Sequence, residues 1–242
     1  AKEERRMQRL DKYLAEAGLE SRRKLRDMVR AGRVTVNGAT VRSPEQHIDE
    51  MTAVVCLDGQ PIARGDRRIV LMMHKPAGCV TAAKDDRYPT VMEYLPAEYR
   101  KLMPIGRLDM DTEGLLLFTN DGDLTKQLTH PSYKKKKIYQ VTLDKPLSEE
   151  DMTKIAEGIT LEDGPIFADE VSYVSENRKE VGIEIHSGKN RIVRRIFESL
   201  GYSVQKLDRV YFAGLTKKRL KRGGWRFLSP REVSMLKSGE YE

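Results

Sequence analysis

The chain has 242 residues, of which 33% are charged, and its formal net charge is +7. This length suits two domains with separate cores, and the basic excess favours a polyanionic partner. Cys56 and Cys79 belong to no CxxC or Cys/His cluster, which argues against a zinc site or disulfide framework and for a reducing compartment. Without a long apolar run or a signal-peptide core, we expect a cytoplasmic protein with no membrane contact.

The basic residues are concentrated in two segments. Residues 1–42 carry a net charge of +6 and residues 187–226 a net charge of +10, so the rest of the chain is acidic, at −9. Lys and Arg side chains that neutralise phosphates release counterions, so such segments control nucleic-acid affinity and its salt dependence. The alternative, a pair of solvated helical faces, is disfavoured by this strong segregation.

Two helices are predicted near the N-terminus, after a flexible extension at residues 1–6. Leu10 and Leu14 have helical spacing, and Gly18 ends that helix. Ser21 suits the N-cap of a second helix, over about residues 22–31, which Gly32 ends in the left-handed conformation. Five cations surround the apolar face of this second helix: Arg22, Arg23, Lys24, Arg26 and Arg30.

A hairpin follows, in which Asn37-Gly38 joins strands at residues 33–36 and 39–41, and further strands are expected near 53–57 and 61–62. This helix–helix–hairpin order, with the segments RLDKYLAEAGLESRRK and AGRVTVNG, resembles the S4 RNA-binding domain over residues 7–62. In that family the basic second helix and the adjacent loop contact structured RNA. The resemblance therefore implies RNA-binding roles for the five cations above and for Arg33.

Residues 63–68 predict a polar linker before a second domain at residues 69–236. That domain opens with a continuous apolar run at residues 69–73, which is typical of a buried strand. KPAG follows at residues 75–78, where proline and glycine end the strand.

Residues 106–122 read GRLDMDTEGLLLFTNDG. The apolar run predicts a buried strand or helix, and Asn-Asp-Gly predicts a turn after it. An isolated aspartate is most often a solvated loop carboxylate. The whole pattern, however, resembles the signature of pseudouridine synthases of the RsuA/RluB/RluE/RluF branch, whose GRLD aspartate is the catalytic nucleophile. The resemblance implies that role for Asp109, and it implies that Arg107 fills the space left by the flipped base or binds backbone.

Three other segments resemble motifs of this family. KPAG matches its KPxG element, which shapes the cleft wall and places Lys75 among the substrate-binding residues. KIYQV at residues 137–141 matches its basic-x-Tyr-x-Val strand, so Tyr139, ordinarily a core residue, is expected to stack on the target uracil. GKNRIVRRIF at residues 188–197 resembles GxxxQVRRM, entering a helix from a glycine turn.

For this last segment the resemblance implies that Val193 packs beneath the base and that Arg194 pairs with Asp109, keeping the carboxylate ionised. Ile192 departs from the pattern, because glutamine is usual there. Tyr139 and Arg194 are thus expected to be catalytic with Asp109. RNA contacts are expected from the remaining cations of the segment: Lys189, Arg191 and Arg195.

The implied fold is α+β: a small N-terminal S4 (αL-type) domain and a catalytic domain with a mixed, mostly antiparallel central sheet, with residues 237–242 frayed. The implied function is isomerisation of a specific uridine in ribosomal RNA, free or in a pre-ribosomal particle, by a monomer. Because the isomerisation has no redox change, no cofactor or metal is required. The compact length and the stretch KPAGCVTAAKDDRYPTVMEYL slightly favour small-subunit over large-subunit rRNA.

Three alternative functions are weaker. A non-catalytic S4-type assembly factor would require inert Asp109, Tyr139 and Arg194. A hydrolytic nucleosidase would be expected to show a second acid placed for catalysis. A structural ribosome-associated protein gains no support from the acidic middle of the chain.

Overall fold

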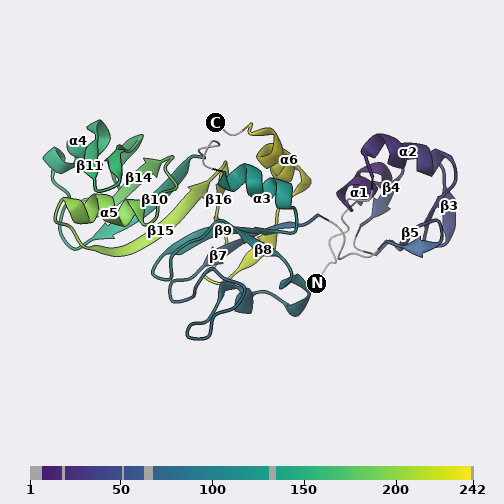
Figure 1. Cartoon of the computed structure of the whole chain (residues 1–242), viewed down its shortest axis with the longest axis horizontal. Helices are drawn as coiled ribbons and strands as arrows, with labels where there is room; N and C mark the ends of the chain where they lie inside the picture. Colours follow the sequence, from purple (N-terminus) through teal and green to yellow (C-terminus); the bar gives the residue numbers. More distant parts are fainter. Residues whose placement is uncertain (1–6, 18–19, 51, 63–67, 131–134, 241–242) are drawn as a thin grey trace. The chain divides into compact units, whose positions relative to one another are not determined.

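The computed structural model describes residues 7–17, 20–50, 52–62, 68–130 and 135–240, which belong to two compact units (Figure 1). One unit ends at Arg68 and the other begins at Ile69. The expected extension at residues 1–6 lies outside the described residues, as does the expected linker except for Arg68.

The N-terminal unit packs two helices against short strands. Its elements are β1 (Met7–Arg9), α1 (Leu10–Glu16), α2 (Arg22–Arg30), β2 (Val34–Val36), β3 (Ala39–Val41), β4 (His47–Asp49), β5 (Val55–Leu57) and β6 (Gln60–Pro61). The predicted signals of the second helix are confirmed: Ser21 accepts from the backbone N–H of Lys24, and Gly32 has φ = 79°. Gly18, predicted to end the first helix, lies outside the described residues. Leu10, Leu14 and Leu25 are fully buried in the shared core.

The C-terminal unit is built on a nine-stranded sheet. Its strands and helices in chain order are β7 (Val70–Lys75), η2 (Val91–Tyr94), η3 (Ala97–Tyr99), β8 (Met103–Ile105), β9 (Glu113–Thr119), α3 (Gly122–Thr129), β10 (Lys137–Leu143), α4 (Glu149–Glu157), β11 (Ile159–Leu161), β12 (Gly164–Ile166), β13 (Glu170–Tyr173), β14 (Glu180–Ile185), α5 (Ile192–Ser199), β15 (Val204–Phe212), β16 (Leu215–Thr216), β17 (Trp225–Phe227) and α6 (Pro230–Ser238). None of the helices in the described ranges is long and apolar enough to cross a membrane.

The central sheet consists of two antiparallel halves joined by one parallel pairing. The strand order is β13-β14-β10-β15-β9-β7-β17, with β16 on β15 and β8 on β9. Only β15 and β9 run parallel in this order, with Asp208 opposite Glu113 and Arg209 opposite Gly114. We call this short pairing the seam. The α+β fold with a mixed, mostly antiparallel sheet, predicted from the family resemblance, is confirmed.

Gly114 allows the two halves to approach at the seam. Its φ is +126°, and a Cβ atom built there would lie 2.4 Å from the carbonyl oxygen of Arg209 and 2.5 Å from its nitrogen. Both the backbone conformation and the space therefore require glycine. This residue is the final glycine of the GRLDMDTEG segment, so the motif contains a packing requirement besides its carboxylates.

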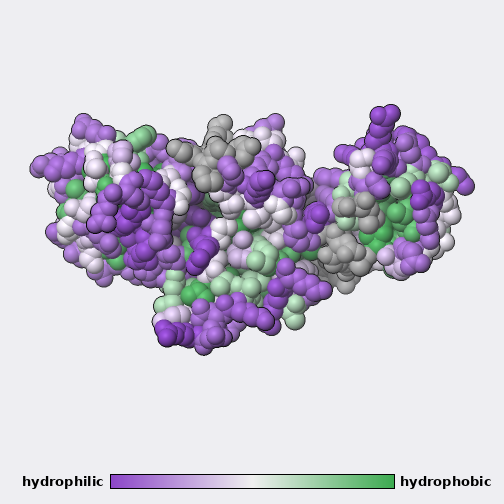
Figure 2. Space-filling model, in the orientation of Figure 1, coloured by the Kyte–Doolittle hydropathy of each residue, from purple (hydrophilic) through white to green (hydrophobic). Residues whose placement is uncertain are grey.

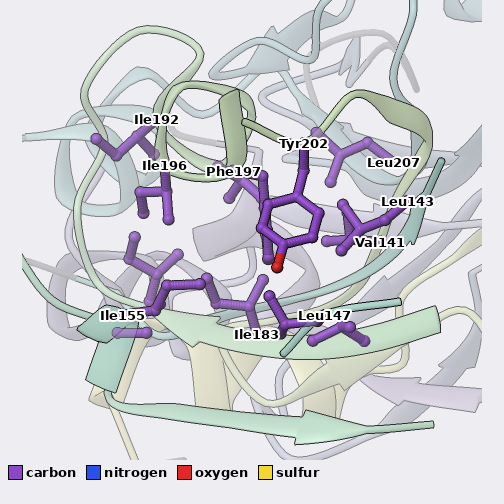
Figure 3. Packing of buried hydrophobic residues seen from close by; sticks show 14 residues of the cluster. Val141, Leu143, Leu147, Ile155, Ile183, Ile192, Ile196, Phe197, Tyr202 and Leu207 are labelled. Carbon is purple, nitrogen blue, oxygen red and sulfur yellow. The ribbon is translucent and has the colours of Figure 1, made fainter. Parts of the chain in front are cut away.

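Each half of the sheet has its own core. In the first half, Ile192, Ile196 and Phe197 of α5 face Val141 of β10 and Ile183 of β14 (Figure 3). In the second half, β9 is buried on both faces. Its alternate residues enter two different clusters: Leu115 and Leu117 pack with α3 and α6, whereas Leu116 and Phe118 pack with η2 and β17. Burial on both faces explains the continuous apolar run.

Helix α6 extends past the predicted boundary of the domain. Ser229 and Glu232 form a capping box at its start, and the helix continues through Ser238 to a left-handed C-cap at Gly239. Gln127 donates hydrogen bonds to the carbonyl oxygens of Leu236 and Lys237. The fraying predicted from residue 237 is therefore wrong for Lys237 and Ser238, because both belong to this packed helix.

Candidate active site

The GRLD loop joins β8 to β9 and is held by its backbone. The hydroxyl of Thr81 donates to the carbonyl oxygen of Leu108 at 2.8 Å and accepts from its N–H at 3.2 Å. Gly78 donates its N–H to Met110 at 2.8 Å, and Thr112 donates its N–H to Asp109 at 3.0 Å. On this fixed loop the Asp109 side chain remains 39% exposed. The carboxylate is thus held in place while still accessible.

Lys75 lies under the loop rather than on its open side. Its residue is fully buried, and its ammonium donates to the carbonyl oxygens of Thr112 at 2.6 Å and Pro76 at 2.9 Å. Burial lowers the pKa of Lys75, while the thiol of Cys79 and the carboxylates of Asp111 and Asp109 oppose the lowering. These contacts support the architectural role of the KPAG element. Because the Lys75 ammonium is buried against backbone carbonyls, it is not exposed for contact with a substrate in this structure.

Two arginines at the start of α5 hold the carboxylates of the loop. Arg191 lies 3.4 Å from Asp109 and bonds Asp111 through both terminal nitrogens, at 3.2 and 3.1 Å. Arg194 donates to the backbone carbonyl of Asp111 at 2.8 Å, and its Nε lies 3.5 Å from the Asp111 carboxylate. Burial acts to raise the pKa of Asp111, but Arg191 and Arg194 outweigh it, so this pKa is lowered.

The predicted Asp109–Arg194 ion pair is wrong for this structure. No Asp109–Arg194 contact within 4.0 Å is present in the part of the chain that the structure describes, and Arg191 is the cation beside Asp109. The reason lies in the surroundings of each guanidinium. Arg194 is only 5% exposed and donates to the carbonyl of Val204 at 3.4 Å as well as to that of Asp111. Arg191 is the N-cap of α5, in the left-handed conformation with φ = 50°.

Tyr139 lies on β10, beside Arg209 of β15, its registered partner across the strand pair. It is half-buried and packs against the core that α5 covers. Val193 is 2% exposed in the same core, which places it near Tyr139 but gives it little open surface. Ile192, which replaces the family's usual glutamine, is 6% exposed and also belongs to this core.

The other cations predicted in this unit have mixed surroundings. Arg195 bonds the carboxylate of Asp163 at 2.9 Å, and Lys189 donates to the carbonyl of the same residue at 3.1 Å. Both therefore hold the turn between β11 and β12. Arg107 is exposed, and within the described ranges its side chain makes no recorded ion pair or hydrogen bond.

In the N-terminal unit, the surface over α2 is mainly hydrophilic (Figure 2). A shallow hollow in this unit is lined by Arg22, Arg23, Arg26, Asp27 and Arg30. Most of the predicted RNA-binding cations already have carboxylate neighbours. Fully buried Asp11 lies 3.5 Å from Arg22 and 3.8 Å from Arg26. The remaining pairs are Arg26 with Glu45, Lys24 with Glu20, Arg30 with Asp27 and Arg33 with Asp58. Among the described residues, Arg23 has no recorded ion pair.

Three residues of the site were missed by sequence reasoning. Asp111 stands inside the GRLD segment, so its position was visible but its role as the anchor of two arginines was not. Arg209 is a single basic residue in a strand, and only the strand register brings it beside Tyr139. Lys137 stands in the KIYQV segment, two residues before Tyr139, but was given no role of its own. No group of three or more His, Cys, Asp or Glu side chains suited to a metal occurs within the described segments.

Comparisons with known proteins show which families the two units match. Residues 69–199 match the family model of RNA pseudouridylate synthases, and residues 8–54 match the S4 domain. Ribosomal large subunit pseudouridine synthase B of Bacillus subtilis (strain 168) is 35% identical over 237 residues, covering 96% of each chain. The protein of that name from Vibrio cholerae is 36% identical over 239 residues, covering 95% of this chain and 74% of its own. A crystal structure of a pseudouridylate synthase superposes with a TM-score of 0.66 and 31% identity, covering 94% of this chain and 99% of its own.

Proposed function

Because the chain belongs to the RNA pseudouridylate synthase family and is therefore an isomerase, we propose that it converts a uridine of ribosomal RNA to pseudouridine with Asp109 as the nucleophile. Two relatives carry the name of a large-subunit enzyme, so large-subunit rRNA is the favoured substrate. The slight preference for small-subunit rRNA drawn from the sequence gains no support from these relatives.

One observation supports the role of Asp109 most strongly: its carboxylate is exposed on a backbone-fixed loop, 3.4 Å from Arg191, at the seam of the sheet. The reaction breaks the N1–C1′ bond, turns the uracil, joins C5 to C1′ and removes the C5 proton. A fixed carboxylate serves this sequence by adding to C1′ or by removing a proton from C2′. Both routes require accessibility and a defined position, which the loop provides.

Other residues are proposed to handle the base. The target uridine must leave the RNA stack, at a cost of a few kcal/mol. Stacking on the Tyr139 ring would contribute about 1–3 kcal/mol toward holding it. Exposed Arg107, two residues before the nucleophile, is the candidate to fill the vacated space or bind backbone. Val193 would support the base from the core side.

Replacing Asp109 with asparagine tests the nucleophile. Asp109→Asn keeps the shape of the side chain, so we expect no measurable pseudouridine, while RNA binding persists because phosphate contacts lie elsewhere. Asp123→Asn, an exposed aspartate at the start of α3, is the matched control and should be fully active. Activity of Asp109→Asn above about a thousandth of wild type would contradict the assignment, since loss of a required nucleophile costs orders of magnitude.

The substrate is tested separately by mapping pseudouridines in rRNA from cells with and without the gene. Loss of one pseudouridine from large-subunit rRNA is expected, and loss from small-subunit rRNA instead would move the proposal to that subunit. Unchanged rRNA would exclude both. Release of free uracil by the purified protein would identify a hydrolytic nucleosidase.

A further inference from the structure

Arg209 is a buried cation that the proposed mechanism leaves unused. Its residue is 5% exposed. In the parts of the chain that the structure describes, no carboxylate lies within 4.0 Å of its guanidinium; the neighbouring Asp208 pairs with Lys217 instead. A buried charge without a counter-charge is costly to fold unless the surrounding groups hydrogen-bond it.

The guanidinium of Arg209 connects three strands across the seam. Its Nε and Nη2 donate to the carbonyl oxygen of Leu115 on β9, at 2.9 and 2.7 Å. It stacks 4.8 Å from the ring centroid of Phe212. Tyr139 of β10 is the registered cross-strand partner of Arg209. Burial lowers the pKa of Arg209, and the neighbouring phenol of Tyr139 opposes the lowering. In the register of β15 and β9, Arg209 is the partner of Gly114. Its side chain reaches the carbonyl of the next residue, Leu115, so Arg209 joins the two strands at two consecutive positions of β9.

From these contacts we infer that Arg209 is the positioning residue for Tyr139, holding the phenol at a set place relative to the strand that carries the nucleophile loop. This inference rests on the proposed function, because Tyr139 is assigned there to the base. Arginine only donates hydrogen bonds, so Arg209 would hold the phenol through its oxygen as the acceptor.

A neighbouring lysine gives the same place a second cation. Lys137 lies two residues before Tyr139 on β10 and donates to the carbonyl of Ser187 at 3.2 Å. Burial, and then the field of Arg209, lowers the pKa of Lys137 to about 8. Cationic donors in a low-dielectric site stabilise negative charge that develops nearby during proton transfer. The inferred arrangement therefore fits a phenol that takes part in removing the C5 proton.

A double-mutant cycle separates a positioning role from a structural one. Arg209→Met should lower kcat roughly tenfold to a hundredfold through a misplaced catalytic group, with RNA affinity unchanged. In a Tyr139→Phe background, where no hydroxyl remains to be held, the same change should have about no further effect. An equal fall in kcat in both backgrounds would overturn the inference, as would a Tyr139→Phe variant with wild-type activity.

A readout independent of activity keeps the inference distinct from the proposed function. In protein labelled at tyrosine Cζ, the Tyr139 resonance, assigned by its loss in Tyr139→Phe, should move in Arg209→Met. The resonance of Tyr173, whose hydroxyl donates to the carbonyl of Leu147 at 2.6 Å, should stay in place. An unmoved Tyr139 resonance would contradict the contact, whatever happens to the nucleophile assignment.

Arg209→Lys provides a second variant if Arg209→Met does not fold. Lysine keeps the buried charge, but its compact ammonium lacks the planar fork that reaches both Leu115 and Tyr139. We expect a folded protein with a reduced kcat and the same loss of effect in the Tyr139→Phe background. A fully active Arg209→Lys with an unmoved Tyr139 resonance would show that charge alone matters and that no positioning occurs.

Discussion

At the scale of single residues, the main finding is that Arg191 is the cation beside the proposed nucleophile Asp109. The sequence motif alone could not identify which arginine takes this place. A repeated basic pattern such as Arg191–Arg194–Arg195 shows that several guanidinium groups stand near a helix start. Which of them reaches Asp109 depends on the φ of +50° at Arg191 and on the carbonyl acceptors that retain Arg194. Both are properties of the folded backbone.

Arg191→Met should therefore lower mainly activity, whereas Arg194→Met should lower mainly stability. Arg191 is 41% exposed, so its loss should cost little stability but lower kcat about tenfold, because Asp109 loses its neighbouring cation. Arg194→Met leaves the carbonyls of Asp111 and Val204 without their donor, so unfolding free energy should fall by about 1–3 kcal/mol. Steady-state rates and chemical denaturation of both variants distinguish the two effects. An inactive Arg194→Met of normal stability beside an active Arg191→Met would restore the original pairing.

At the scale of elements, the pattern of apolar residues predicted where an element lies better than whether it is a helix or a strand. The run Leu115–Phe118 indicated a buried strand or helix, and in the structure it lies in strand β9. The run is continuous because both faces of this strand are covered, so it lacks the alternation that would have identified a strand. The Asn-Asp-Gly turn was predicted, but it also begins a helix: Asp121 caps α3 by accepting from two backbone N–H groups. The short signals of Ser21 and Gly32 were sufficient because capping depends on neighbouring residues alone.

The seam gives a test at this scale through two of the three glycines of the GRLD segment, Gly114 and Gly122. Gly114→Ala should destabilise the protein by several kcal/mol, since strain at φ = +126° adds about 1–3 kcal/mol to a backbone clash at 2.4 Å. Gly122→Ala, at the first position of α3 with no atom within 4 Å of the new Cβ, should be neutral or slightly stabilising. Urea denaturation of the two variants measures the contrast. Equal stabilities would mean that the seam can open without loss.

At the scale of the whole molecule, the two units have separate cores. The hydrophobic cluster of the first unit contains residues only up to Ile62, and the other three clusters contain only residues from Ile69 onward. The sequence identified both units because each resembles a known family over most of its length. It did not reveal how many cations are already paired within their unit, because carboxylates such as Asp11 and Asp58 are distant in sequence from those cations.

Removing residues 1–62 should leave a folded catalytic unit that binds rRNA more weakly. The salt dependence of binding should flatten, because phosphate-neutralising cations on α2 are lost. The change in slope should be smaller than six charges would give, since five of the six predicted cations have carboxylate neighbours. Affinity for an rRNA fragment across a salt series compares the two forms. Identical slopes would mean that these cations face solvent when RNA is bound.

The divided sheet also has a consequence for the order in which the chain folds. The half that contains Tyr139 and α5 comes from one continuous stretch, β10 to β15. The half that contains Asp109 is completed only when β17 pairs with β7 and α6 covers Leu115, more than 100 residues after Asp109 itself. Contacts between the halves join residues 80 to 94 positions apart, and such long loops close slowly. A nascent chain is therefore expected to complete the half that contains Asp109 only after β17 and α6 have been synthesised.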